Sequence, residues 1–126
     1  MKSRQQEQLE RDIRSAWSAE TSADPTRWTA TNPAWGQCAV TALVVQDELG
    51  GQLERTVISG ISHYFNRLPN GQVVDLTFDQ FDQPEASGTV ESRDRSYVLG
   101  FPDTRRRYHL LRGRVRVSLR ARGSSA

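Results

Sequence analysis

Apolar residues recur at helical spacing in the first part of the chain. Leu9, Ile13 and Trp17 fall on one face of residues 4–20, where most other positions are charged or polar. This spacing predicts an amphipathic helix. Turn-forming residues follow it, and the prolines there predict an irregular loop over residues 28–35.

Residues 39–49 are apolar on several faces, because six of the first seven positions carry apolar side chains. Such a segment predicts a central, buried helix. Gly50 and Gly51 follow directly and act as stop signals. Beyond them, residues 53–59 fit a first strand, and residues 61–78 fit a hairpin.

The turn residues of this hairpin predict its register. Residues 69–71 read Pro-Asn-Gly, which suits a three-residue loop with Gly71 in a left-handed conformation. The resulting register pairs Phe65 with Asp75 and puts His63 and Asp75 on one face of the sheet. As diagonal neighbours they would lie about 7–8 Å apart at the backbone, within reach of an imidazole and a carboxylate.

The second half of the chain is patterned more weakly. Residues 77–80 resemble a capping box that opens a short helix. We expect a loop over 82–96 and a short strand at 97–99. Residues 114–119 alternate as in a half-buried strand, but the wider spacing favours a helix that begins at Asp103-Thr104. Residues 123–126 we expect to be disordered.

Composition indicates one globular domain spanning residues 1–126, with an ordered core at about 4–120. Hydrophobic residues make up 36% of the chain and charged residues 25%, and no apolar run approaches a membrane span. The polar N-terminus lacks the apolar core of a signal peptide, so we expect a cytoplasmic protein without membrane contact. The oligomeric state stays open.

The single cysteine excludes an internal disulfide and any metal site built on several thiolates. Two histidines are too few for a histidine-rich metal centre without carboxylate help. Phosphate-loop and dinucleotide motifs are missing as well. We therefore expect no metal and no cofactor.

The same cysteine, Cys38, falls at the predicted start of the apolar helix. Unpaired N–H groups and the helix dipole favour a thiolate there. His63 and Asp75 follow in the sequence. Cysteine, histidine and carboxylate supply a nucleophile, a base and a group that orients the base.

Each of these residues also has a structural interpretation. Cys38 would be a small buried hydrophobe, and His63 a core histidine. Asp75 lies in an apolar run and needs a partner, for which His63 and Arg67 are the candidates. Gln37 would either donate to an oxyanion or cap the helix.

Two further candidates are aromatic. Trp28 and Trp35 would either wall a substrate groove or pack against the core, and packing is the more common role. His109, among arginines, we expect at the surface. Eight arginines follow Asp103 while no acidic residue does. This basic segment would meet nucleic acid or form a solvated helix face, and we favour the latter.

Residues 35–42, which read Trp-Gly-Gln-Cys-Ala-Val-Thr-Ala, resemble the YunG-like family of small bacterial proteins. Residues 62–77 and 107–111 resemble the same family, so the resemblance spans about residues 10–117. The last of these segments also favours the helical interpretation of the C-terminal part.

More coarsely, the layout resembles papain-like cysteine hydrolases and transglutaminase-like proteins, with Cys38, His63 and Asp75 in the order that these groups use. The resemblance implies an α+β fold, with an N-terminal helix and a central Cys-bearing helix packed on a small antiparallel sheet. Two departures count against a protease. Gln37 is adjacent to the cysteine, whereas the papain-like oxyanion glutamine precedes it by several residues, and the chain is short.

Our leading hypothesis is a thiol-dependent hydrolase or acyltransferase that attacks an amide, ester or thioester through Cys38, His63 and Asp75. The alternative is a non-catalytic module of the same fold that binds a peptide or protein. Nucleic-acid binding ranks last, because aromatic residues are not interleaved with the arginines.

Overall fold

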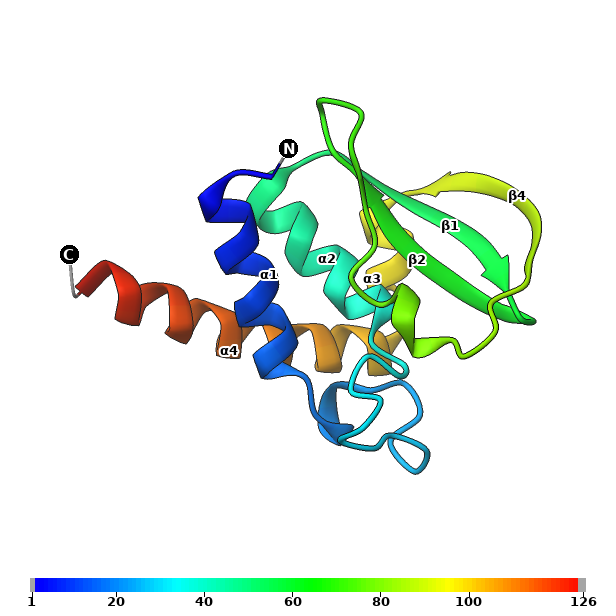
Figure 1. Ribbon diagram of the computed structural model, residues 1–126, viewed down its shortest axis with the longest axis horizontal. Helices are drawn as coiled ribbons and strands as arrows, with labels where there is room; N and C mark the ends of the chain where they lie inside the picture. The colour runs from blue at the N-terminus through cyan, green and yellow to red at the C-terminus, as the bar shows by residue number, and fades with distance from the viewer. Residues whose placement is uncertain (1, 125–126) are drawn as a thin grey trace.

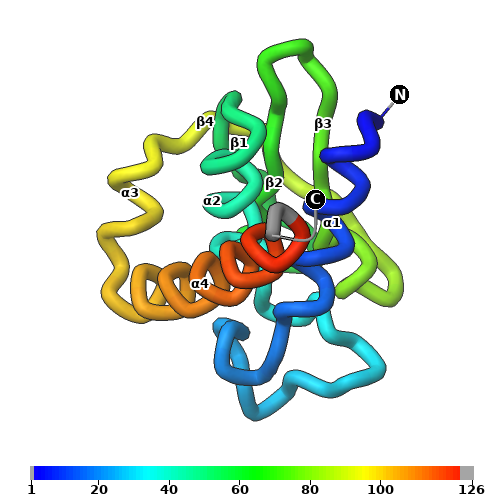
Figure 2. Tube along the Cα trace, turned by 90° about the vertical axis from the view of Figure 1, so that its left-hand side faces the viewer, coloured from blue at the N-terminus to red at the C-terminus, as the bar shows by residue number. Residues whose placement is uncertain are grey.

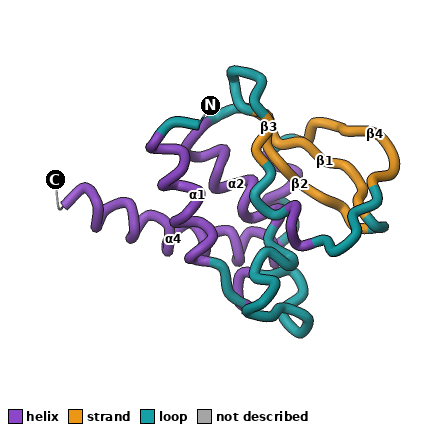
Figure 3. The backbone as a smooth tube through the Cα atoms, viewed as in Figure 1, coloured by secondary structure: helices purple, strands orange, loops and turns teal. Residues whose placement is uncertain are grey.

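Helices and strands gather at opposite ends of the molecule (Figure 3). The structure is a computed structural model that describes residues 2–124. The helices are α1 (Arg4–Ala16), α2 (Cys38–Leu49), α3 (Arg95–Leu99) and α4 (Pro102–Ser124), with 3-10 turns η1 (Ala19–Thr21) and η2 (Phe78–Gln80). The strands are β1 (Gln52–Ile58), β2 (Ile61–Arg67), β3 (Val73–Val74) and β4 (Ala86–Arg93). The predicted α+β class is confirmed.

The first helix is shorter than predicted. Ser3 caps α1 by accepting a hydrogen bond from the Gln6 amide, and the helix ends at Ala16 rather than residue 20. Trp17 then adopts an extended backbone, which turns its indole toward α2, where Nε1 donates to Thr41 Oγ1 at 2.9 Å. Burying the indole with its N–H satisfied accounts for the early end of the helix.

Helix α2 is the centre of the core. Residues 40–45 are all buried, and the helix packs against β2 and α4. Asn66 on β2 donates to the Ala42 carbonyl at 2.9 Å and fixes the helix on the sheet. Gly50, at φ 74°, ends the helix as predicted.

The sheet is antiparallel, with strand order β3-β2-β1-β4. Arg67 pairs with Val73 and Asn66 with Val74, which is the predicted hairpin register. Gly71 has φ 86°, so the left-handed turn position is also confirmed. Strand β3 is only two residues long, and the chain then leaves the sheet toward η2 instead of pairing as far as residue 78.

Two expectations for the second half are wrong. Residues 86–93 form strand β4 rather than a loop, and residues 95–99 form α3 rather than a strand. Seven of the eight β4 residues are exposed, so the strand has no buried face to produce an alternating pattern. In α3 only Val98 is buried. Residues 77–80 do form the expected short helix, but the Thr77 side chain makes no capping hydrogen bond.

The C-terminal segment is a long helix, α4, which passes the lower end of α1 and runs below α2 in Figure 1 and is seen obliquely in Figure 2. It passes through residues 123–124, which we expected to be disordered, whereas residues 125–126 lie outside the described part. His109 is exposed, as predicted. None of the helices in residues 2–124 is both long and apolar enough to cross a membrane.

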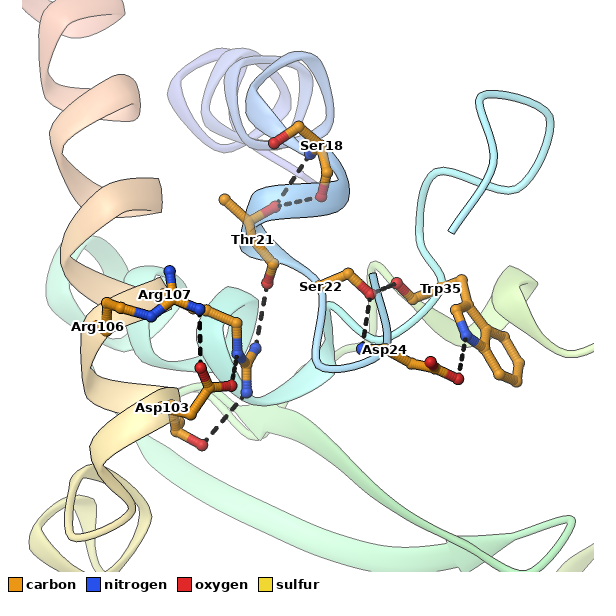
Figure 4. Close-up of polar contacts among 9 residues, drawn as sticks. Ser18, Thr21, Ser22, Asp24, Trp35, Asp103, Arg106 and Arg107 are labelled. Atoms are coloured by element: carbon orange, nitrogen blue, oxygen red, sulfur yellow. Dashed lines mark hydrogen bonds and ion pairs between the residues drawn. The ribbon is translucent and has the colours of Figure 1, made fainter. Parts of the chain in front are cut away.

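The predicted solvated arginine face of α4 is corrected in part. Arg107 is only 4% exposed; its guanidinium donates to the Thr21 carbonyl at 3.1 Å and to Asp103 at 2.8 Å (Figure 4). Arg114 donates to the Ala16 carbonyl at 2.9 Å. These guanidiniums satisfy backbone carbonyls at the ends of α1 and η1, which otherwise lack partners.

A tightly bonded loop leads into α2. Ser22 Oγ donates to the Trp35 carbonyl at 2.7 Å and accepts from the Asp24 amide, while the Trp35 indole donates to Asp24 (Figure 4). The Ala23 amide donates to the Gly36 carbonyl at 2.9 Å. Gly36 has φ 73°, and a Cβ there would overlap Ser22 Oγ and approach the Ala23 nitrogen to 2.9 Å. Only glycine fits at this crossing.

Arg107→Ala should lower the free energy of unfolding by about 2–3 kcal/mol, because it leaves the Thr21 carbonyl without its partner and removes a buried aliphatic stem. Arg106→Ala is the matched control. Arg106 pairs with the same Asp103 but its side chain is 63% exposed, so its loss should cost about 0.5 kcal/mol or less. Urea denaturation measures both. Equal costs would contradict the role given to Arg107.

Gly36→Ala should destabilise the fold by about 3 kcal/mol or more, since it adds a steric overlap to the strain of a positive φ. Gly60→Ala separates these two effects. Gly60 has φ 78° with open space around it, so the change should cost only about 1–2 kcal/mol. Urea denaturation of both variants tests the difference. If Gly36→Ala cost no more than Gly60→Ala, the loop would have to be looser than described.

Candidate functional site

Cys38 is the first residue of α2, as its sequence position predicts. The Thr41 amide closes the first turn on the Gln37 carbonyl at 3.0 Å. The cysteine is partly exposed, and its thiol lies 3.7 Å from the Ser62 carbonyl on β2. The helix start thus holds the thiol against the strand that carries His63.

His63 is completely buried. Three aromatic rings surround the imidazole, with centroids 6.2, 6.4 and 5.3 Å away, from Phe65, Phe78 and Phe81. Its Nε2 lies 2.7 Å from Asp75 Oδ2, and its Nδ1 has no hydrogen-bond partner among the described residues. One ring nitrogen is therefore fixed by a carboxylate while the other stays available.

Asp75 follows β3 immediately, and its side chain is 20% exposed. Its partner is His63 and not Arg67, whose guanidinium binds Glu54 at 2.9 Å. The sequence allowed either His63 or Arg67 as the partner of Asp75, and the structure shows that it is His63. The second oxygen of Asp75, Oδ1, is buried without a hydrogen-bond partner among the described residues.

The electrostatics of the imidazole follow from this arrangement. Burial lowers the pKa of His63, but the hydrogen bond that His63 donates to Asp75 and the nearby Cys38 side chain raise it more, and the net pKa is about 9. His63 is therefore mostly protonated at neutral pH. In this state Nε2–H donates to Asp75, and Nδ1–H is a donor without a hydrogen bond, close enough to interact with the thiol.

The other predicted site residues, Gln37, Trp28 and Trp35, form their hydrogen bonds elsewhere and not with Cys38, His63 or Asp75. Gln37 is fully buried and donates to the Ser18 carbonyl at 2.9 Å, so the expected capping bond is missing. Trp28 donates to the Pro33 carbonyl at 2.9 Å and is partly buried. Trp35 binds Asp24, as described above, and is also partly buried. Both indoles hold the loop before α2 together.

Gln80, which the sequence did not single out, joins the two halves of the site. Its side chain is buried; Oε1 accepts from the Gly36 amide at 3.2 Å, and Nε2 donates to the Thr77 carbonyl at 3.0 Å. Its own carbonyl accepts from Asn32 at 3.0 Å. Gln80 therefore links the segment after Asp75 to the loop before Cys38, and no sequence signal distinguishes it from a surface glutamine.

The aromatic enclosure was also missed, although one signal was available. Phe65 lies two residues after His63, on the same face of β2. Phe78 and Phe81 reach the imidazole only because the chain leaves the sheet after β3, which the predicted longer strand did not include. Within residues 2–124, no group of three or more histidine, cysteine or acidic side chains is placed to hold a metal ion.

Comparison with known proteins gives a family. Residues 5–120 match the family model described as YunG protein. The chain is 37% identical over 87 residues to the "Uncharacterized protein YunG" of Bacillus subtilis (strain 168), an alignment that covers 68% of this chain and 72% of that protein. No solved structure matches the chain. The match over residues 5–120 includes Cys38, His63 and Asp75, and the chain therefore belongs to the YunG family.

Proposed function

We propose that this protein is a thiol-dependent hydrolase or acyltransferase with a papain-like or transglutaminase-like core. One observation carries the proposal. A buried imidazole is fixed through Nε2 by a carboxylate at 2.7 Å, and its other nitrogen is left without a hydrogen bond beside the thiol at the start of α2. Nucleophile, base and orienting group have this relation in nucleophilic catalysis.

In the proposed resting state the thiol proton resides on His63, giving a thiolate and an imidazolium. The Cys38 thiolate attacks the carbonyl carbon of an amide, ester or thioester, and the backbone N–H of Cys38 stabilises the oxyanion. As the tetrahedral intermediate collapses, Nδ1–H of His63 protonates the leaving group, and an acyl-cysteine remains.

Release of the acyl group reverses these roles. Neutral His63 takes a proton at Nδ1 from water or from another acceptor nucleophile, whose oxygen or nitrogen attacks the thioester carbon. The Cys38 thiolate leaves and His63 is again protonated. Asp75 keeps Nε2 protonated throughout, so that Nδ1 is the nitrogen that exchanges protons.

The enclosure of His63 supports this chemistry. Phenylalanine rings exclude water from the imidazole, and the Asp75 bond acts more strongly in such surroundings than in water. Gln37 is fully buried against Ser18, so we give it a supporting role at the helix start and not a contact with substrate. A thiol nucleophile persists in reducing compartments, and we place the protein in the cytoplasm.

A non-catalytic binding module is the second candidate, and one observation favours it. The Cys38 thiol is within 3.7 Å of the Ser62 carbonyl, a contact that a protonated thiol makes as a weak donor. A protein that keeps its thiol in this state would bind a peptide or protein partner without reacting. The reactivity of Cys38 decides between the two candidates.

At pH 6.5, iodoacetamide should label Cys38 at least about tenfold faster in the parent than in His63→Gln, because His63 holds the thiol proton. Cys38 is the only cysteine, so intact-mass spectrometry reports this residue alone. Circular dichroism checks that the variant folds. Slow labelling at the same rate in both proteins would favour the binding module.

A second readout uses p-nitrophenyl acetate, whose hydrolysis should proceed through an acyl-enzyme. The parent should turn this ester over, and Cys38→Ala should lose the reaction while keeping its folding transition. Undiminished turnover by Cys38→Ala would contradict the proposed nucleophile.

Asp75→Asn should lower the pKa of His63 well below the value of about 9 in the parent, because burial is then opposed by Cys38 alone. NMR of the imidazole Cε1–H measures this, and His109→Gln assigns the signals of the two histidines. The folded-state pKa is raised above the ordinary 6.5. The stability that His63 contributes is therefore complete below pH 6.5 and is lost as the pH rises through 9. An unshifted titration in Asp75→Asn would contradict this account.

A further inference from the structure

Arg55 on β1 and the candidate nucleophile, Cys38, both contact the same residue, Ser62. Its Nε and Nη2 lie 3.0 and 2.6 Å from Ser62 Oγ. The carbonyl of the same serine is the group that the Cys38 thiol contacts at 3.7 Å. Ser62, at the start of β2, thus contacts the guanidinium through its side chain and the thiol through its backbone carbonyl.

Arg55 has no carboxylate partner among residues 2–124. Glu91 stands directly opposite it on β4, but the Glu91 carboxylate binds Arg93 at 2.6 Å. The Glu91 carboxylate thus pairs with Arg93, and the Arg55 guanidinium keeps its positive charge beside Ser62, the residue that Cys38 contacts. Other arginines of the sheet region do form ion pairs, such as Arg67 with Glu54 at 2.9 Å.

Aromatic side chains flank this charge. Tyr64 is the direct cross-strand partner of Arg55, and Tyr97 on α3 is 53% exposed with the Arg93 guanidinium 5.9 Å from its ring centre. Burial raises the pKa of Tyr64, and Tyr97, Arg55, Cys38 and Arg93 also influence it. Tyr64 therefore lies within electrostatic range of both the thiol and the Arg55 guanidinium.

Arg55 and Ser62 keep hydrogen-bond donors that are suited to binding an anion. A guanidinium has five N–H donors, and Ser62 Oγ accepts two of them, so three remain. The Ser62 hydroxyl, which accepts both of these bonds, keeps its own hydrogen to donate. Guanidinium and hydroxyl donors together suit the oxygens of a carboxylate or a phosphate.

We propose that Arg55 and Ser62 bind an anionic group of the substrate, a carboxylate or a phosphate, close to the acyl carbon that Cys38 attacks. This inference rests on the proposed thiol chemistry and specifies its substrate class as acyl compounds that carry a negative charge near the reacting bond. Arg55 would then determine specificity, by placing that bond over the thiol.

Two alkylating probes of similar size test this without a known substrate. Iodoacetate carries a carboxylate and iodoacetamide is neutral, and both react at Cys38. The ratio of their rate constants cancels changes in the reactivity of the thiol itself. Arg55→Gln should lower the iodoacetate-to-iodoacetamide ratio about tenfold, the loss expected when a charged hydrogen bond becomes neutral. Arg55→Lys should retain most of the ratio.

Two further variants serve as controls. Glu91→Gln should raise the ratio, because it removes the carboxylate that stands opposite Arg55. Arg106→Gln removes a positive charge from α4 and leaves its partner Asp103 paired with Arg107, and should leave the ratio unchanged. A ratio that Arg55→Gln does not change would overturn the inference.

The outcomes separate this inference from the proposed function. Rapid, His63-dependent iodoacetamide labelling with a ratio insensitive to Arg55 would leave the nucleophile in place and remove the anion site. Slow, His63-independent labelling with a ratio that still falls in Arg55→Gln would support the anion site and contradict the proposed nucleophile. Succinate and inorganic phosphate are then compared as competitors of iodoacetamide. Protection by one of them assigns the anion, and protection by neither overturns the site.

Discussion

The hydrogen bond between His63 and Asp75 is the interaction on which the candidate site depends. It joins the middle of β2 to the chain just after β3, at the point where that chain leaves the sheet. A carboxylate and an imidazole at this depth are tolerated because each satisfies the other. The bond also decides which nitrogen of His63 is occupied, and so makes the other nitrogen available to Cys38.

The loop that leads to Cys38 is held by close backbone packing and by neutral hydrogen bonds, and not by a charged pair. Gly36 allows the loop to pass against Ser22 without a side chain between them, and Gln80 attaches this loop to the segment that follows Asp75. The two halves come from opposite sides of α2 in the sequence. Their relative position therefore depends on packing as much as on the catalytic groups themselves.

Sequence patterns predicted the parts of this arrangement that local chemistry determines. The residues of the hairpin turn gave the register that aligns His63 with Asp75, and the apolar run after Cys38 gave the buried helix. Sequence patterns failed where contacts between distant parts of the chain determine the conformation or burial of a residue. Strand β4 is polar because both of its faces are largely exposed, and Arg107 is buried because distant carbonyls need a donor. Arg55 was missed since its significance depends on Cys38, which reaches it only through Ser62 and precedes it by 17 residues.

The contacts of α4 have a consequence for how the chain is made. Arg107, Arg114 and Arg122 bind segments 86, 98 and 110 residues earlier, at Thr21, Ala16 and Asp12. At about 5–20 residues per second of synthesis, the carbonyl of Thr21 waits about 4–17 s before its arginine exists. Helix α1 and the 3-10 turn η1 thus spend this interval on the ribosome without their final supports. The groups around the thiol, from Ser62 to Phe81, are made within about 45 residues of Cys38, whereas the supports of α1 come last, so the two ends of the chain join only when synthesis is nearly complete.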